Sequence, residues 1–141
     1  MKAIILAFLI AGYSPQGDWQ EQFRWSVAQF EKTTTDWYQH PQPRLSRLIE
    51  TGRGNCVAYG KLAQALAFTH GHKVRCYTLK DIFKNARHRI VIVTDSKGKW
   101  MVTNREIVKM KNTRDAVKYF KDPYRVEKKW DATWFDDDAD D

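Results

Sequence analysis

The segment that decides the fold is RHRIVIVTDSKGKWMVTN, residues 87–104. Its apolar run from Ile90 to Val93 is typical of a buried strand. The polar sequence DSKG at residues 95–98 follows this run and predicts a tight turn. Residues 99–104 then predict a strand that returns antiparallel to the first, so the segment is expected to form a β-hairpin.

The sequence around this hairpin predicts helices before it, and further strands and a helix after it. Apolar residues at spacings of four, four and three predict a helix over 18–32, with Asp18 as its cap. The other expected elements are helices over 45–52 and 56–70, strands over 74–79 and 107–110, and a helix that Asn112 or Thr113 caps and that ends before Pro123. This order predicts an α+β fold, with N-terminal helices packed on an antiparallel sheet.

Length and composition exclude several classes of protein. The chain has 141 residues, which is one domain that can bury a core without disulfide bonds. Its composition is 43% hydrophobic and 13% aromatic, which excludes collagen-like, low-complexity and wholly disordered chains. Two cysteines are too few for a disulfide scaffold or a four-cysteine zinc site. No apolar run reaches the roughly 20 residues of a membrane-spanning helix.

The charge is strongly uneven along the chain. The net charge is +7, and five acids lie in residues 136–141, a tail that we expect to be disordered. Without the tail, 12 acids stand against 24 basic residues. Such a basic body attracts phosphates, anionic lipids or acidic proteins, although a solvated basic surface is the simpler interpretation.

The N-terminus, MKAIILAFLIAG at residues 1–12, has the layout of a short signal peptide. A lysine precedes an apolar stretch, and small residues follow it. If the segment is cleaved, the protein is exported, as to a periplasm, and the mature domain covers residues 13–135. The alternative is a buried first strand or helix of a cytoplasmic protein.

Cys56 is the first candidate for chemistry. A cysteine nucleophile needs a lowered pKa, a base and donors for an oxyanion. Cys56 stands at a predicted helix start, where free N–H groups and the helix dipole favour a thiolate. Gly54 is expected to permit an unusual turn and to leave room for a substrate backbone. A purely structural cysteine is the alternative.

His88 and Asn104 are the candidates for the base and its orienting residue. If Thr94 pairs with Gly98 across the turn, His88 faces Asn104 directly, and the amide can orient the imidazole. A pairing shifted by one residue would send the two side chains to opposite faces of the sheet. A surface histidine and an asparagine that merely ends a strand are the alternatives.

Residues 53–104 resemble the transglutaminase-like superfamily, including the bacterial transglutaminase-like cysteine peptidases. The resemblance rests on GNC at 54–56, which opens an Ala-rich helix, and on GHKVR at 71–75, which leads into a strand. It continues with His88, which precedes an apolar strand, and with GKWMVTN at 98–104.

The resemblance implies a papain-like core in which Cys56 is the nucleophile, His88 the base and Asn104 the orienting residue. It implies a cysteine peptidase or amidase that acts on a protein or peptide through a thioester. A protein-glutamine acyltransferase, either a transglutaminase or a deamidase, is the alternative. No metal or organic cofactor, no nucleic-acid partner and no membrane span are expected, and we expect a monomer.

The chain also departs from the family pattern. The orienting residue is usually an aspartate, and the Asp-Asn pair common in the peptidase branch is Thr103-Asn104 here. Arg89 follows His88, where the family usually has a small or apolar residue. These departures favour a second hypothesis, an inactive binding module whose basic surface holds an acidic protein or nucleic acid.

Other residues of chemical interest are expected to be structural. His70 and His72 are expected to cap a helix end. A disulfide between Cys56 and Cys76 is an alternative in an exported protein and would remove the nucleophile. Asp95 is a poor candidate to orient His88, because it lies at the turn, one strand length away, and His40 lies in a Pro-rich loop. Trp37, Tyr38 and Trp100 are expected in the core, with the lining of a cleft as the alternative, and Trp130, Trp134 and Phe135 are expected in the last packed segment.

Overall fold

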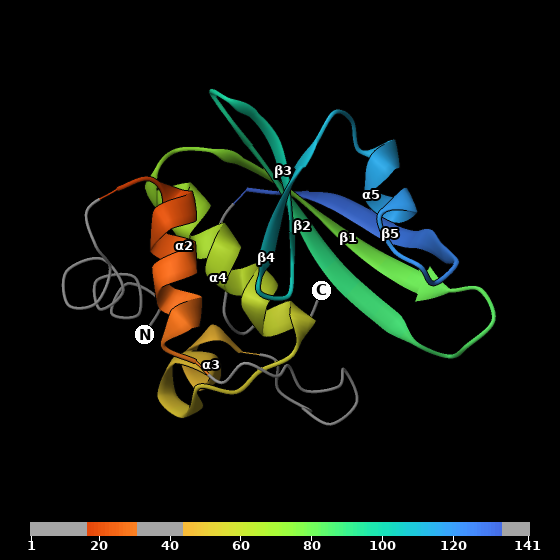
Figure 1. Cartoon of the computed structure of the whole chain (residues 1–141), viewed down its shortest axis with the longest axis horizontal. Helices are drawn as coiled ribbons and strands as arrows, with labels where there is room; N and C mark the ends of the chain where they lie inside the picture. The colour runs from red at the N-terminus through yellow and green to blue at the C-terminus, as the bar shows by residue number, and fades with distance from the viewer. Residues whose placement is uncertain (1–16, 31–43, 134–141) are drawn as a thin grey trace.

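In the computed structural model, the described residues are 17–30 and 44–133, and they form helices packed around a five-stranded antiparallel sheet (Figure 1). The strand order is β4-β3-β2-β1-β5. The α+β class predicted from the sequence is therefore confirmed. The elements are α2 (Trp19–Ala28), α3 (Leu45–Thr51), α4 (Cys56–Thr69), β1 (Lys73–Asp81), β2 (Arg87–Asp95), β3 (Gly98–Thr103), β4 (Glu106–Met110), α5 (Arg114–Lys118) and β5 (Tyr124–Ala132).

The helix boundaries follow the capping signals of the sequence. The Asp18 carboxylate accepts a hydrogen bond from the Glu21 N–H and caps α2, as predicted, although α2 ends at Ala28 rather than at residue 32. Gly52 follows α3 and Gly71 follows α4, and both adopt the left-handed backbone that ends helices. The predicted start and end signals of these helices are thus confirmed.

Helix α4 lies between the other N-terminal helices and one face of the sheet. Its Gly60 lies so close to β2 that an added Cβ would stand 3.1 Å from Val91 Cγ2. The small residues of α4 therefore let its backbone approach the strand, and a large buried core forms around it. The principal core residues here include Trp19, Phe23, Leu48, Tyr59, Leu62, Leu66, Val91 and Val93.

The opposite face of the sheet carries a second, smaller core under α5. Its buried members are Tyr77, Leu79, Ile90, Ile92, Met101, Met110 and Ala116. Successive residues of β2 thus point alternately into the two cores. This arrangement explains why the apolar run from Ile90 to Val93 is continuous rather than alternating.

Asp95 fixes the turn end of the β2–β3 hairpin. Its carboxylate accepts hydrogen bonds from the Lys97 and Gly98 amides and from the indoles of Trp19 and Trp100, both at 3.0 Å. Burial alone would raise the pKa of this carboxyl, but the hydrogen bonds from the two indoles hold it below its ordinary value. Asp95 therefore joins α2 to the hairpin.

Strand β5 has no counterpart among the predicted elements. It pairs with β1 along its length, with a register shift between Thr78 and Leu79, and it carries Trp130.

Several predictions lie outside the described residues: the signal peptide (1–12), the acidic tail (136–141), and Trp37, Tyr38, His40, Trp134 and Phe135. Within the described ranges, no helix has the length and apolar character needed to cross a membrane.

Candidate functional site

Cys56 is placed at the first turn of α4 by the cap that precedes it. The Asn55 side chain accepts hydrogen bonds from the Val57 and Ala58 amides at 3.1 and 3.2 Å. These two N–H groups are therefore already engaged. Gly54 does not make room for a substrate, contrary to the prediction, because an added Cβ would lie 3.2 Å from Leu48 Cδ1. Gly54 instead lets α3 and α4 pack closely.

The thiol of Cys56 lies against the strand that carries His88. Its sulfur accepts a hydrogen bond of 3.3 Å from the Arg89 amide, just beyond the Ile90–Thr103 pair where the β2–β3 ladder ends. Burial raises the pKa of the thiol to about 11, and the Arg89 amide and guanidinium only partly offset it. The sulfur is thus protonated at neutral pH, contrary to the expected thiolate.

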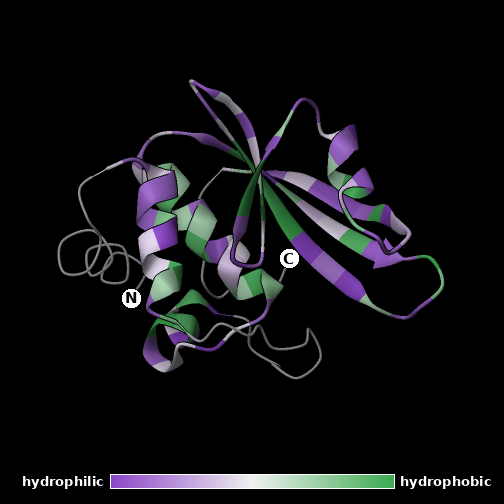
Figure 2. Ribbon diagram, viewed as in Figure 1, coloured by the Kyte–Doolittle hydropathy of each residue, from purple (hydrophilic) through white to green (hydrophobic). Residues whose placement is uncertain are grey.

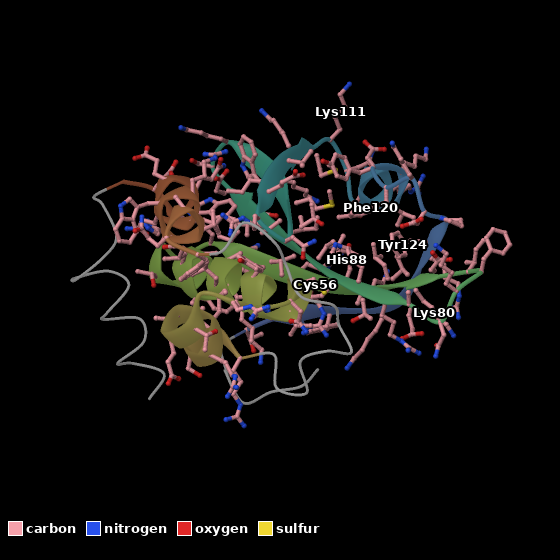
Figure 3. All side chains as sticks on the ribbon, turned by 60° about the horizontal axis from the view of Figure 1, so that its bottom comes forward. Cys56, Lys80, His88, Lys111, Phe120 and Tyr124 are labelled. Atoms are coloured by element: carbon pink, nitrogen blue, oxygen red, sulfur yellow. The ribbon has the colours of Figure 1, made fainter. Side chains whose placement is uncertain are left out.

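The His88 imidazole is held by a hydroxyl and two aromatic rings. Its Nε2 lies 2.7 Å from Thr103 Oγ1, and its ring centroid lies 5.3 Å from that of Phe120 and 6.2 Å from that of Tyr124 (Figure 3). Burial lowers the pKa of His88 to about 4. The imidazole is therefore neutral at pH 7 and has the lone pair that a base requires.

The Cys56 sulfur, at the start of α4, contacts β2 at Arg89, the residue next to His88, but it does not bond the imidazole. His88 shares the α5 face with Ile90, whereas α4 packs on the opposite face. Within residues 17–30 and 44–133, no hydrogen bond joins the thiol to the imidazole. Among the described residues, the thiol and the imidazole therefore lack the hydrogen bond that a preformed Cys–His pair makes.

Asn104 is not the partner of His88, and that prediction is wrong. Asp95, not Thr94, pairs with Gly98, so the register is shifted by one residue and Thr103 shares the face of His88. Asn104 occupies the two-residue turn between β3 and β4, with φ of +48°. Asparagine tolerates this left-handed conformation better than most residues do, which accounts for its presence there.

Arg89 is a buried cation beside the thiol. Its Nε donates a 3.3 Å hydrogen bond to Thr78 Oγ1, and its guanidinium carbon lies 4.7 Å from the centroid of the Trp130 ring. The positive charge lowers the pKa of Cys56, although less than burial raises it. Arg89 stands where the transglutaminase-like family usually has a small or apolar residue, and it therefore places a fixed positive charge at the candidate site.

Thr103 and Tyr124 are the site residues that sequence reasoning missed. Burial raises the pKa of Tyr124, and the charges of Asp122, of Asp81 and, once it is ionised, of Cys56 raise it further. Tyr124 is thus within electrostatic range of the thiol and also packs against His88. The correct strand register of the hairpin would have placed Thr103 on the face of His88, but no local sequence signal identifies Tyr124 as a site residue.

The second cysteine is separate from this site. Both cysteines are free, so the alternative disulfide is absent. Gln64 Nε2 donates a 2.7 Å hydrogen bond to Cys76 Sγ within the α4 side of the core. His70 ends α4, and its Nε2 lies 2.9 Å from Gln22 Oε1, consistent with a structural role. In the described parts of the chain, no three His, Cys, Asp or Glu side chains gather as a metal site would require.

Two hollows lie away from Cys56 and His88. One, of about 580 Å³, is lined in part by Tyr77 and Arg114, and the other, of about 780 Å³, by Lys73 and Lys99 among others.

Comparison with protein-family models, with curated proteins and with solved structures finds no match for this chain.

Proposed function

We propose that the chain is a cysteine-dependent acyl-transfer hydrolase of the transglutaminase-like type, which cleaves an amide in a protein or peptide. Cys56 is the nucleophile, His88 the base and Thr103 the residue that orients the base. The observation that carries the proposal is the hydrogen bond from Arg89 to the Cys56 sulfur, because it fixes the thiol next to the strand position of a histidine held by Thr103.

The chemistry starts from two neutral groups. With Nε2–H donating to Thr103 Oγ1, His88 Nδ1 carries the free lone pair. The proposed step requires the imidazole to rotate from its place on the α5 face toward the strand edge, where Nδ1 takes the thiol proton as Sγ attacks the carbonyl carbon. His88 then returns this proton to the leaving amine, and water hydrolyses the thioester. Thr103 replaces the aspartate or asparagine usual in such sets, and Arg89 stabilises the negative charge that develops on sulfur.

Turnover of fluorescein-labelled casein by the full chain tests the proposal. Cys56→Ala is expected to abolish turnover, whereas Cys76→Ser, the matched control, is expected to retain it. Incorporation of a dansylated amine instead of hydrolysis would identify the transglutaminase alternative. Unchanged casein turnover by Cys56→Ala would refute the role of this thiol.

The reactivity of the two thiols is a test that needs no substrate. Both cysteines are buried, so burial alone predicts equally slow alkylation by iodoacetamide. Assistance by His88 is expected to make Cys56 react at least tenfold faster than Cys76 at pH 7. His88→Ala should remove that difference. Equal rates in the wild type would contradict the proposed base.

An inactive binding module is the second candidate function. The raised pKa of Cys56 and the lowered pKa of His88 favour it, because they oppose a thiolate–imidazolium pair. Lys73 and Lys99 line the larger hollow and would hold an acidic ligand there. For this candidate we expect binding of poly-glutamate that Lys73→Gln with Lys99→Gln weakens, together with slow alkylation of both cysteines.

A further inference from the structure

The tip of the β1–β2 hairpin exposes two large apolar side chains. Phe83 is 83% exposed and Ile82 is 52% exposed, compared with 45% for Tyr119 and 40% for Val126. The hairpin projects from the body of the molecule, and part of its turn is hydrophobic (Figures 1 and 2). Because exposed apolar surface is costly in water, this turn is a candidate contact surface.

Hydrogen bonds to backbone amides hold the tip of the hairpin in this shape. The Asp81 carboxylate accepts hydrogen bonds from the Phe83 and Lys84 amides at 2.9 and 3.1 Å. The Ile82 amide donates to the Pro123 carbonyl at 3.0 Å, which ties the turn to the start of β5. The exposure of Phe83 therefore follows from a fixed turn, and the side chain is presented to solvent without a loop rearrangement.

A row of cations crosses the sheet just behind the tip. Lys80 lies opposite Arg87 on β2 and opposite Arg125 on β5. Like charges opposite one another destabilise a sheet, so an anion at this row would be favourable. Glu127 pairs with Arg87 at 2.7 Å, and its pKa is lowered first by Arg87 and also by Lys80 and Arg125. Glu127 therefore lies within electrostatic range of all three cations.

We propose that this hairpin tip docks the protein onto an anionic lipid bilayer. Phe83 and Ile82 enter the interfacial region, and the row of Lys80, Arg87 and Arg125 meets the lipid headgroups. Protruding apolar side chains combined with a cationic flank suit a deformable, negatively charged surface. This role is independent of the chemistry proposed for Cys56.

Sedimentation with vesicles tests the proposal on the full chain. We expect binding to phosphatidylcholine vesicles containing a quarter phosphatidylglycerol and little binding to pure phosphatidylcholine. Phe83→Ser should weaken binding roughly tenfold because it removes most of the inserted apolar area. Val126→Ser, an exposed apolar control on β5, should bind as the wild type does. Lys80→Gln should weaken binding about fivefold, as expected for one charge near the surface.

Three results would overturn the proposal. These are no sedimentation with the anionic vesicles, equal binding by Phe83→Ser and Val126→Ser, or equal binding to charged and uncharged vesicles. Binding of poly-glutamate that requires Phe83, without vesicle binding, would identify an acidic protein as the partner instead. Since Phe83 is exposed, we expect its replacement to leave the far-ultraviolet circular dichroism unchanged.

Discussion

The two ends of β2 are built in opposite ways. At the turn end, the Asp95 carboxylate accepts four hydrogen bonds, two of them from the indoles of Trp19 and Trp100. At the other end, within the described ranges, His88 Nε2 bonds the Thr103 hydroxyl, and the Cys56 sulfur accepts the Arg89 amide. The first end stabilises the fold through polar contacts, whereas the second buries titratable groups and keeps them neutral.

The largest effect is expected at the turn end. Asp95→Ala leaves two indole N–H groups without an acceptor, and Trp19 is fully buried. We expect the free energy of unfolding to fall by about 4 kcal/mol, measured by urea denaturation at pH 7. Asp95→Asn, which keeps one acceptor oxygen, should lose about half of that. Wild-type stability of Asp95→Ala would remove the contrast between the two ends.

A smaller effect is expected from the titration of His88. Burial lowers its pKa from 6.5 to about 4, so between these values the unfolded chain binds a proton that the folded chain excludes. Above pH 6.5 His88 is neutral in both states and does not affect the free energy of unfolding. As the pH falls from 6.5 to 4, protonation of the unfolded chain lowers the free energy of unfolding by about 3 kcal/mol. Urea denaturation at several pH values measures it. His88→Gln should flatten this part of the pH profile, and a profile shared by both proteins would show that other groups cause it.

The smallest effect is expected at Thr103. Thr103→Val removes the hydroxyl next to His88 Nε2 and should cost about 1 kcal/mol of unfolding free energy. Thr103→Ser, which keeps the hydroxyl, is the control and should cost less. If the valine variant is as stable as the serine variant, the hydroxyl contributes nothing and the two ends differ even more than described.

A charged replacement at the same position sharpens the comparison. Thr103→Asp places a carboxylate beside the imidazole, and we expect it to raise the pKa of His88 from about 4 by one to three units. The chemical shifts of the His88 ring protons, followed by nuclear magnetic resonance as a function of pH, measure this pKa. Thr103→Asn has nearly the same shape without the charge, so an equal pKa in the two variants would exclude an electrostatic cause.

The sequence predicts the elements of this fold better than their register. The hairpin and the Asp18 cap depend on local signals, and both were predicted correctly. The register of β2 against β3 was not predicted correctly. A strand buried on both faces has no alternation of apolar and polar residues to show which side chains share a face. A loop of two residues rather than three therefore exchanged Asn104 for Thr103 as the neighbour of His88.

Strand β5 escaped prediction for a different reason. Its sequence, YRVEKKWDA, is largely charged and most of its side chains are exposed. It forms a strand because β1 offers hydrogen-bonding partners along its length, which is tertiary information. The contribution of Tyr124 to the site depends on this pairing and was hidden for the same reason.

The position of β5 also has a consequence for how molecules meet. Among the strands of residues 17–30 and 44–133 it is the outermost one beside β1, and the edge of such a strand can recruit another chain. Lys128 and Lys129 lie on this strand with Arg125, so a second copy adding there in register would set cation against cation. Crowded solutions of this protein should therefore resist growth of the sheet into fibrils from this border.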